Sequence, residues 1–286
     1  MTIPVVRGMA AIAPDYDALI LDLWGVVHDG AAPFPGVIDC LARLREAHKR
    51  VIILSNAPRR AHRAAARLDE MAIGADCYSA IITSGEAGRL ALERRDEPWS
   101  AALGTGFFHI GKAADSDLLD DLDYAPVADL EEAGFLLCTG TLNVAEEDAI
   151  LRRAVVLGLA MVCVNPDLAV IHNGKREPCA GALAASYESL GGTVHRIGKP
   201  YAGVYDLCFE DLDTIDHGRI LVVGDGLATD ILGAETVGLP SLLVTGGLLA
   251  DAWGTDRMTP PEPERLEAAC QDAGVRPTAA IPAFVW

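Results

Sequence analysis

Acidic and hydroxyl side chains follow separate apolar runs of this chain, and a lysine between glycine and proline lies among them in the sequence, in an order that suggests phosphate chemistry. They are Asp22, Ser55, Lys199 and Asp225. A carboxylate can attack phosphorus or carbon as a nucleophile, and two carboxylates with other oxygens can hold Mg²⁺. A hydroxyl at a helix start and a mobile lysine both bind phosphate oxygens. Each residue alone is a weak signal, because Asp and Ser commonly form turns after strands, so the prediction depends on their order.

These residues need a sheet that brings the ends of its strands together. Short apolar runs alternate with longer helical stretches, which is typical of parallel βαβ units. Continuous apolar strands indicate a sheet covered by helices on both faces, where ligands bind beyond the carboxyl ends of the strands. We expect strands at 18–22, 51–54, 80–83, 220–223 and 241–244, and helices at 36–48 and 59–71.

The middle of the chain has an alternation of its own. Strands are expected at 107–110, 135–138 and 161–164, with helices at 116–122 and 145–157, and a last helix at 262–273. The sequence therefore predicts an α/β protein. A Rossmann-like, doubly wound parallel-sheet core is formed by 1–86 and 191–286, and an α/β domain is inserted over 87–190.

Composition excludes several classes of protein. The 286 residues carry 23 Lys+Arg against 41 Asp+Glu, a net charge of −18, which disfavours nucleic acid and anionic membranes as partners. The seven cysteines are scattered without a CxxC pair, which indicates reduced thiols and a cytoplasmic protein. No apolar run approaches the roughly 18 residues of a membrane span. Eleven acids and no Lys or Arg lie between Ala113 and Leu151, so much of the charge belongs to solvated faces.

The ordered motifs resemble one family of hydrolases. They read Asp22-Leu23-Trp24-Gly25-Val26-Val27, Leu54-Ser55-Asn56-Ala57, Gly198-Lys199-Pro200, and Val223-Gly224-Asp225-Gly226 continuing to Asp230. This order is similar to that of the haloacid dehalogenase superfamily. The nearest group is its class IIA branch of p-nitrophenyl, phosphoglycolate and sugar phosphatases, which carries a C2-type α/β cap. The resemblance implies Mg²⁺-dependent hydrolysis of a small phosphate monoester, from a sugar or another phosphorylated metabolite.

The resemblance also assigns roles to the acidic residues. Asp22 matches the nucleophile that becomes an aspartyl-phosphate. Asp225 matches a metal ligand, with Asp22 and the backbone carbonyl of Trp24 completing the oxygen set. Asp230 matches an acid that orients metal-bound water, and the alternative for it is an ordinary helix N-cap.

Other positions match groups that bind the substrate. Lys199 would hold both the phosphoryl group and Asp22. In the inserted domain, Asn165-Pro166-Asp167 matches a further family motif, and His172 is an additional candidate contact. The substrate-binding candidates are Gly25, Ser55, Asn56, Asn165, Asp167 and Lys199.

One position departs from the family pattern. Trp24 stands where family phosphatases carry a second aspartate as general acid and base, and an indole N–H only donates. General acid–base catalysis is typically worth ~10²–10⁴-fold, so we expect weak turnover. His28 or Asp29 lies close enough in sequence to reach the site, and His28 has the better intrinsic pKa for proton transfer. Either His28 replaces the missing acid, or it is a surface or cap-contacting histidine. The catalytic candidates are Asp22, Lys199 and His28.

Two other functions stay open at this point. The chain would be a non-catalytic protein that binds or senses a phosphorylated metabolite if proton transfer has been lost. Attack of Asp22 on carbon, as in dehalogenation, is the third reading. Asp225 and Asp230 argue against it, because that chemistry needs no metal. The resemblance also leaves open a homodimer through the cap.

Overall fold

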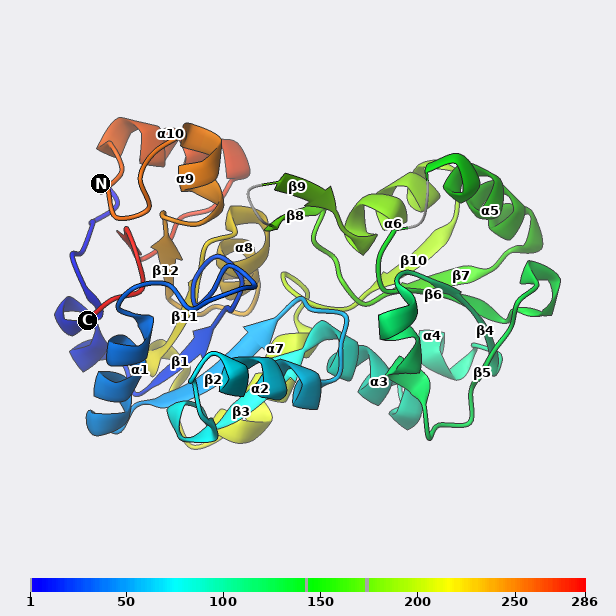
Figure 1. Cartoon of the computed structure of the whole chain (residues 1–286), viewed down its shortest axis with the longest axis horizontal. Helices are drawn as coiled ribbons and strands as arrows, with labels where there is room; N and C mark the ends of the chain where they lie inside the picture. Colours follow the sequence, from blue (N-terminus) through cyan, green and yellow to red (C-terminus); the bar gives the residue numbers. More distant parts are fainter. Residues whose placement is uncertain (1, 142–143, 173–174) are drawn as a thin grey trace. The chain divides into compact units, whose positions relative to one another are not determined.

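The chain folds into two compact units in the computed structural model, which describes residues 2–141, 144–172 and 175–286 (Figure 1). The first unit comprises 1–55, 64–82 and 199–286, and the second comprises 56–63 and 83–198. The second unit thus includes a short segment, 56–63, that precedes the expected insertion at 87–190. The expected domain bounds, a core of 1–86 and 191–286 with an insertion at 87–190, remain a prediction.

The first unit is built on a six-stranded sheet with strand order β13-β12-β11-β1-β2-β3. The pairs β1–β2, β1–β11, β11–β12 and β12–β13 are parallel. The strands are β1 (Ala18–Leu21), β2 (Arg50–Ser55), β3 (Ala80–Thr83), β11 (Ile220–Gly224), β12 (Ser241–Val244) and β13 (Ala279–Ile281). The helices are α1 (Val37–Glu46), α7 (Gly203–Leu212), α8 (Leu232–Thr236), α9 (Leu248–Trp253), α10 (Pro263–Ala273) and, from Ala64 onward, α2 (Ala61–Glu70).

Both faces of this sheet are covered, as the continuous apolar strands predicted. Leu242 and Val244 of β12 pack in one cluster with Leu41 of α1. Leu243, which points to the opposite face, packs in another cluster with Leu266 of α10. Side chains alternate between the faces of a strand, so each strand is apolar along its whole length because helices bury both sides. The expected doubly wound, Rossmann-like α/β fold is confirmed (Figure 1).

The second unit has a parallel sheet of its own, with strand order β10-β7-β6-β4-β5. Its strands are β4 (Gly106–Ile110), β5 (Ala125–Pro126), β6 (Phe135–Cys138), β7 (Ala160–Cys163) and β10 (Thr193–Arg196), and β8 (Ala169–His172) with β9 (Lys175–Pro178) forms an antiparallel pair. Its helices are α3 (Ser84–Arg94), α4 (Pro98–Ala101), α5 (Val144–Leu157) and α6 (Ala180–Ser189). The α-helix expected at 116–122 is instead a 3₁₀ helix at Ala113–Leu119, in a stretch rich in Asp, which favours turns over α-helix.

The order of the first sheet places the polar strand ends at a switch point. From β1 the chain passes to β2 on one side, and it later returns to β11 on the other side of β1. In open α/β sheets, ligands bind beyond the carboxyl ends of the strands where the order reverses. Asp22 follows β1 and Asp225 follows β11, so both lie at this position. Within the described part of the chain, no helix is long and apolar enough to cross a membrane.

Candidate active site

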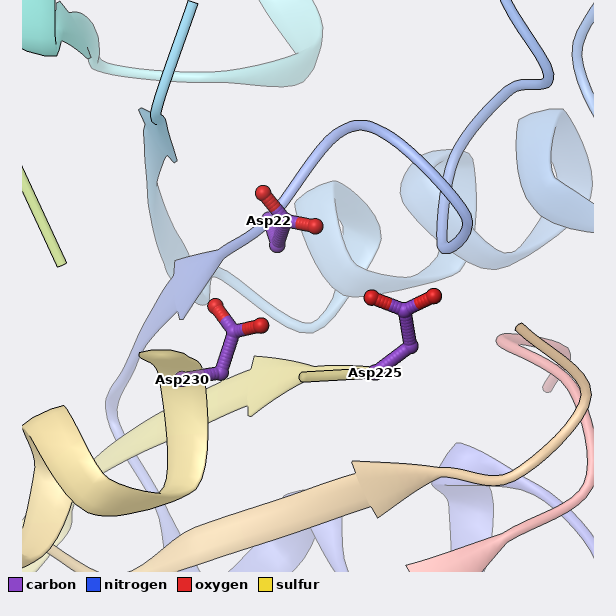
Figure 2. A group of neighbouring side chains, drawn as sticks. All are labelled: Asp22, Asp225 and Asp230. Atoms are coloured by element: carbon purple, nitrogen blue, oxygen red, sulfur yellow. The ribbon is translucent and has the colours of Figure 1, made fainter. Parts of the chain in front are cut away.

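Three buried carboxylates converge at the switch point of the first unit. Asp22 follows β1, Asp225 follows β11, and Asp230 lies in a π-helical turn at Leu227–Ile231. One oxygen from each lies within 4.8 Å of the others. Figure 2 shows the three side chains pointing toward one another from these elements. Asp22, Asp225 and Asp230 therefore lie together as predicted, and their role as metal ligands remains a proposal.

Lys199 is buried among these acids and pairs with two of them. Its Nζ lies 2.6 Å from Oδ1 of Asp22 and 2.7 Å from Oδ1 of Asp230. Burial by itself lowers the pKa of Lys199, but the two carboxylates outweigh it and raise that pKa above its ordinary value. The lysine therefore keeps its charge although it is only 2% exposed.

Asp225 is enclosed by backbone on two sides. The N–H of Leu248 donates to its Oδ2 across 2.9 Å. A Cβ added at Gly25 or at Gly247 would collide with the same carboxylate, so both loops need glycine to approach it. Burial and then repulsion from Asp230 raise the pKa of Asp225 to about 7. Burial also raises the pKa of Asp22 well above its ordinary range.

The donor set suits a divalent cation. Three carboxylates lie together with one ammonium, which pairs with two of them, so this group carries excess negative charge when all three acids are ionised. Burial first, and then repulsion from Asp230, raises the pKa of Asp225. Mg²⁺ favours one or two carboxylates together with waters and phosphate oxygens. The carboxylate oxygens of Asp22 and Asp225 fit that preference.

Asp230 is not a helix N-cap. The cap positions of the π-helical turn and of α8 are Gly226 and Ile231, and neither has a side-chain cap bond. Instead, Oδ2 of Asp230 accepts the N–H of Gly226 at 3.0 Å while Oδ1 accepts from Lys199. Asp230 thereby ties the lysine to the turn that begins directly after Asp225.

The loop after Asp22 packs around the ring of Trp24. This indole is half-buried, meets the His28 ring edge-on at 5.6 Å between centroids, and lies where a Cβ on Gly30 would collide with it. His28 is buried, and its Nδ1 accepts the N–H of Gly30 at 3.0 Å. Burial lowers the pKa of His28, so the ring is neutral near pH 7 and its proton is on Nε2. The N–H of a neutral imidazole is a very weak acid, so in this state His28 can donate a hydrogen bond from Nε2 but is a poor proton donor.

The predicted substrate-binding residues fall into two groups. Gly25, Ser55 and Lys199 belong to the first unit, where Ser55 is buried at the end of β2 and Gly25 has φ +80°. The other three lie in the second unit and contact one another: Asn56 Nδ2 donates to Oδ1 of Asp167 at 2.8 Å, and the Asp167 N–H donates to Oδ1 of Asn165 at 3.2 Å. The side chain of His172 lies outside the described residues. These binding roles remain predictions.

Sequence reasoning missed two groups beside Asp225. The N–H of Leu248 follows the glycine pair after β12, and that pair was a usable signal of close backbone approach. Arg257, whose guanidinium reaches the carbonyls of Gly25 and Gly246, lies in a segment without strand or helix. No local pattern marks this arginine, because its contacts join residues far apart in the sequence.

Comparison with known proteins identifies related sequences over most of the chain. Residues 19–125 match the family model described as haloacid dehalogenase-like hydrolase, and residues 196–265 match a second model, described as HAD-hydrolase-like. D-glycerol 3-phosphate phosphatase of Mycobacterium tuberculosis is 30% identical over 252 residues, which cover 86% of this chain and 67% of that protein.

Solved structures agree with this sequence match. A haloacid dehalogenase-like hydrolase of Brucella suis 1330 superposes with a TM-score of 0.82 at 30% identity, covering 98% of this chain and 100% of that one. The glycerol phosphate phosphatase of Mycobacterium tuberculosis, solved in complex with magnesium, gives a TM-score of 0.66 at 26% identity, covering 83% of this chain and 70% of that one.

Proposed function

This chain belongs to the class IIA branch of the haloacid dehalogenase-like hydrolases, and we propose that it hydrolyses a small phosphate monoester through an aspartyl-phosphate on Asp22. The observation that carries the proposal is the buried cluster of Asp22, Asp225 and Asp230 with Lys199. This cluster supplies a nucleophile, a cation for phosphate oxygens and a set of oxygen ligands in one place.

The residues divide the reaction between them. An oxygen of Asp22 attacks phosphorus and the bond from phosphorus to the leaving alcohol breaks, so that the phosphoryl group is held on Asp22. Lys199 pairs with Asp22 beforehand and stabilises negative charge on the phosphoryl oxygens. Mg²⁺ bound by Asp22, Asp225 and the Trp24 carbonyl would neutralise further charge on the transferring group. Water then attacks phosphorus and releases phosphate and the Asp22 carboxylate.

Proton transfer is the weak point of this site. The leaving alkoxide needs a proton, and Trp24 has no acid to give. Solvent is one source, and His28 is the other only in its imidazolium form, which burial disfavours. We therefore propose slow turnover of alkyl phosphates and faster turnover of esters whose leaving group departs as a stable anion.

The substrate class follows from the relatives. The Mycobacterium tuberculosis protein is named for D-glycerol 3-phosphate, which supports a small phosphorylated metabolite as the substrate of this chain. The contacting group Asn56, Asn165 and Asp167 offers amide and carboxylate oxygens that suit hydroxyl groups of such a molecule. Dimerisation through the second unit is a separate proposal, which light scattering in solution tests.

A panel of phosphate esters tests the activity, with Mg²⁺ or with EDTA. We expect phosphate release by the wild type in Mg²⁺ only, and none by Asp22→Asn. Asp17→Asn is the matched control, because Asp17 is an exposed acid that pairs with Arg219 in the same unit. Release by Asp22→Asn at the wild-type rate would refute the aspartyl-phosphate.

A second function is favoured by the packing of Trp24. Its indole is fixed against His28 and Gly30 at the position of the missing acid. A chain that binds phosphorylated metabolites without turnover is the alternative reading. Tight binding of an ester that remains intact over hours in Mg²⁺ would select it over hydrolysis.

A further inference from the structure

Two loops lie against the carboxylate of Asp225, and both also make contacts with another residue. One loop contributes Gly25 and the other contributes Gly247 and the N–H of Leu248. Both approaches are too close for a side chain, so a small movement of either loop changes the space around Asp225. An interaction that fixes the two loops relative to each other would therefore preserve the geometry around Asp225.

Arg257 joins these two loops through their backbone. Its Nη2 donates to the carbonyl of Gly25, and its Nη1 donates to the carbonyl of Gly246 at 2.7 Å. The guanidinium lies over the ring of Phe34, with its central carbon 3.2 Å from the ring centroid. A planar guanidinium can donate to two carbonyls from separate nitrogens while its flat face lies on an aromatic ring.

The arginine keeps its position at an energetic disadvantage. Its Nε is buried with no hydrogen-bond partner among the described residues. Burial lowers the pKa of Arg257 to about 10, and the charge of Asp225 is the strongest of those that oppose this. A buried donor without a partner destabilises a fold, so a role for the arginine in this place would account for its position.

We propose that Arg257 is a positioning residue for the metal site, acting by fixing the loops of Gly25 and Gly246 around Asp225. The Gly25 carbonyl follows directly after that of Trp24, the proposed backbone ligand, so holding one orients the other. Arg257 is not itself a ligand, since a guanidinium has no lone pair to give. The inference rests on the proposed metal site but not on any turnover.

Binding of Mn²⁺ alone, measured by calorimetry on the whole chain, tests this role. Loss of residues that support metal ligands typically lowers affinity ~10–100-fold, and we expect a loss in that range for Arg257→Met. Arg257→Lys, which keeps the charge but lacks the planar pair of donor nitrogens, should bind with intermediate affinity. Arg265→Met is the matched control, because it also removes an arginine from an aromatic ring, that of Trp253, away from Asp225.

A second readout separates positioning from general loss of structure. We expect Arg257→Lys to need more Mg²⁺ for half-maximal activity while its KM for the ester, measured at saturating Mg²⁺, stays unchanged. If Arg257→Met does not fold, Arg257→Lys decides alone. Wild-type Mn²⁺ affinity in Arg257→Lys overturns the inference, and so does a wild-type chain that binds no Mn²⁺. Absence of any phosphatase activity overturns only the proposed function, because the Mn²⁺ measurement needs no substrate.

Discussion

Lys199 donates to Oδ1 of Asp22 across 2.6 Å, so the proposed nucleophile is already paired with a cation before a phosphate arrives. A second bond of 2.7 Å joins the same ammonium to Asp230. The lysine therefore holds together two acids that would otherwise repel each other.

Replacing this lysine should expose that repulsion. Breaking a buried ion pair from one side typically costs about 3–5 kcal/mol, so Lys199→Met should lower the free energy of unfolding by an amount of that order in EDTA. We expect a smaller loss in Mg²⁺, because a divalent cation takes over part of the charge. Urea unfolding in both conditions measures this, with the exposed Lys112→Met as control. An equal loss in EDTA and Mg²⁺ would contradict the expectation.

Asp225 should make metal-free stability depend on pH. Its pKa is about 7 in the folded chain and roughly 3.9 in an unfolded one, so folding favours its protonated form. This stabilisation is full below about pH 4 and is lost as pH rises through 7. In EDTA we expect a lower melting temperature at pH 8 than at pH 6. Asp225→Asn should flatten this step, and a step that persists in the variant belongs to another group.

Metal binding should show the opposite trend. A proton on Asp225 competes with the cation, so Mn²⁺ affinity should rise by about tenfold between pH 6 and pH 8. Added Mn²⁺ should therefore raise the melting temperature more at pH 8 than at pH 6. An affinity that does not change over this range would argue that Asp225 is not a ligand.

Trp24→Asp should restore the missing acid. We expect kcat for an alkyl phosphate to rise by about 10²-fold or more, with a much smaller gain for 4-nitrophenyl phosphate, whose leaving group needs no proton. Trp24→Asn is the control of matched size without an acid. If the asparagine variant gains as much as the aspartate variant, Trp24 limits turnover by obstruction and not by its lack of a proton.

His28→Asn tests whether His28 donates a proton. Asparagine can still accept the N–H of Gly30 that Nδ1 now accepts, while Nε2 is lost. If Nε2 protonates the leaving group, single-turnover release of an alkyl alcohol should slow and release of 4-nitrophenolate should not. Unchanged release of both would leave His28 as a buried loop residue only.

Gly247→Ala should disturb the metal site directly. A Cβ there collides with Asp225, and forcing extra volume into packed surroundings typically costs about 1–3 kcal/mol. We expect weaker Mn²⁺ binding by about tenfold or more, in line with other disturbances beside a ligand. Gly203→Ala is the control, since no atom lies within 4 Å of a Cβ there. Similar Mn²⁺ affinities in the two variants would show that the close approach is unimportant.

Most of the core sheet could be predicted because its strands are short and apolar throughout. Val51 to Leu54 and Ile220 to Val223 have no polar residue to disguise them. Helix α6 was not predicted, because it is buried on much of its surface, through Ala180, Leu183 and Tyr187. Its sequence therefore lacks the alternation of apolar and polar faces that marks a surface helix. The short pair β8–β9 gave too little pattern to detect.

The site was predictable wherever a residue follows a strand directly. Asp22, Ser55 and Asp225 are positioned by the sheet itself, so their place in sequence determines their place in space. Asn56 was expected with Ser55, yet its amide contacts Asp167, more than a hundred residues away in sequence. Contacts between such distant side chains depend on how loops pack, and a single sequence does not encode them locally.

The membership of residues 56–63 in the second unit has a consequence for recombination between relatives. Besides Asn56, Arg59 of this segment pairs with Asp115 at 2.9 Å, and Arg63 pairs with Asp117. If 83–198 alone were exchanged with a relative, the acidic residues of one protein would have to pair with residues 56–63 of the other. A chimera that takes 56–63 together with 83–198 from one parent keeps every one of these pairs. The unit that can be exchanged intact is therefore encoded by two separate stretches of the gene.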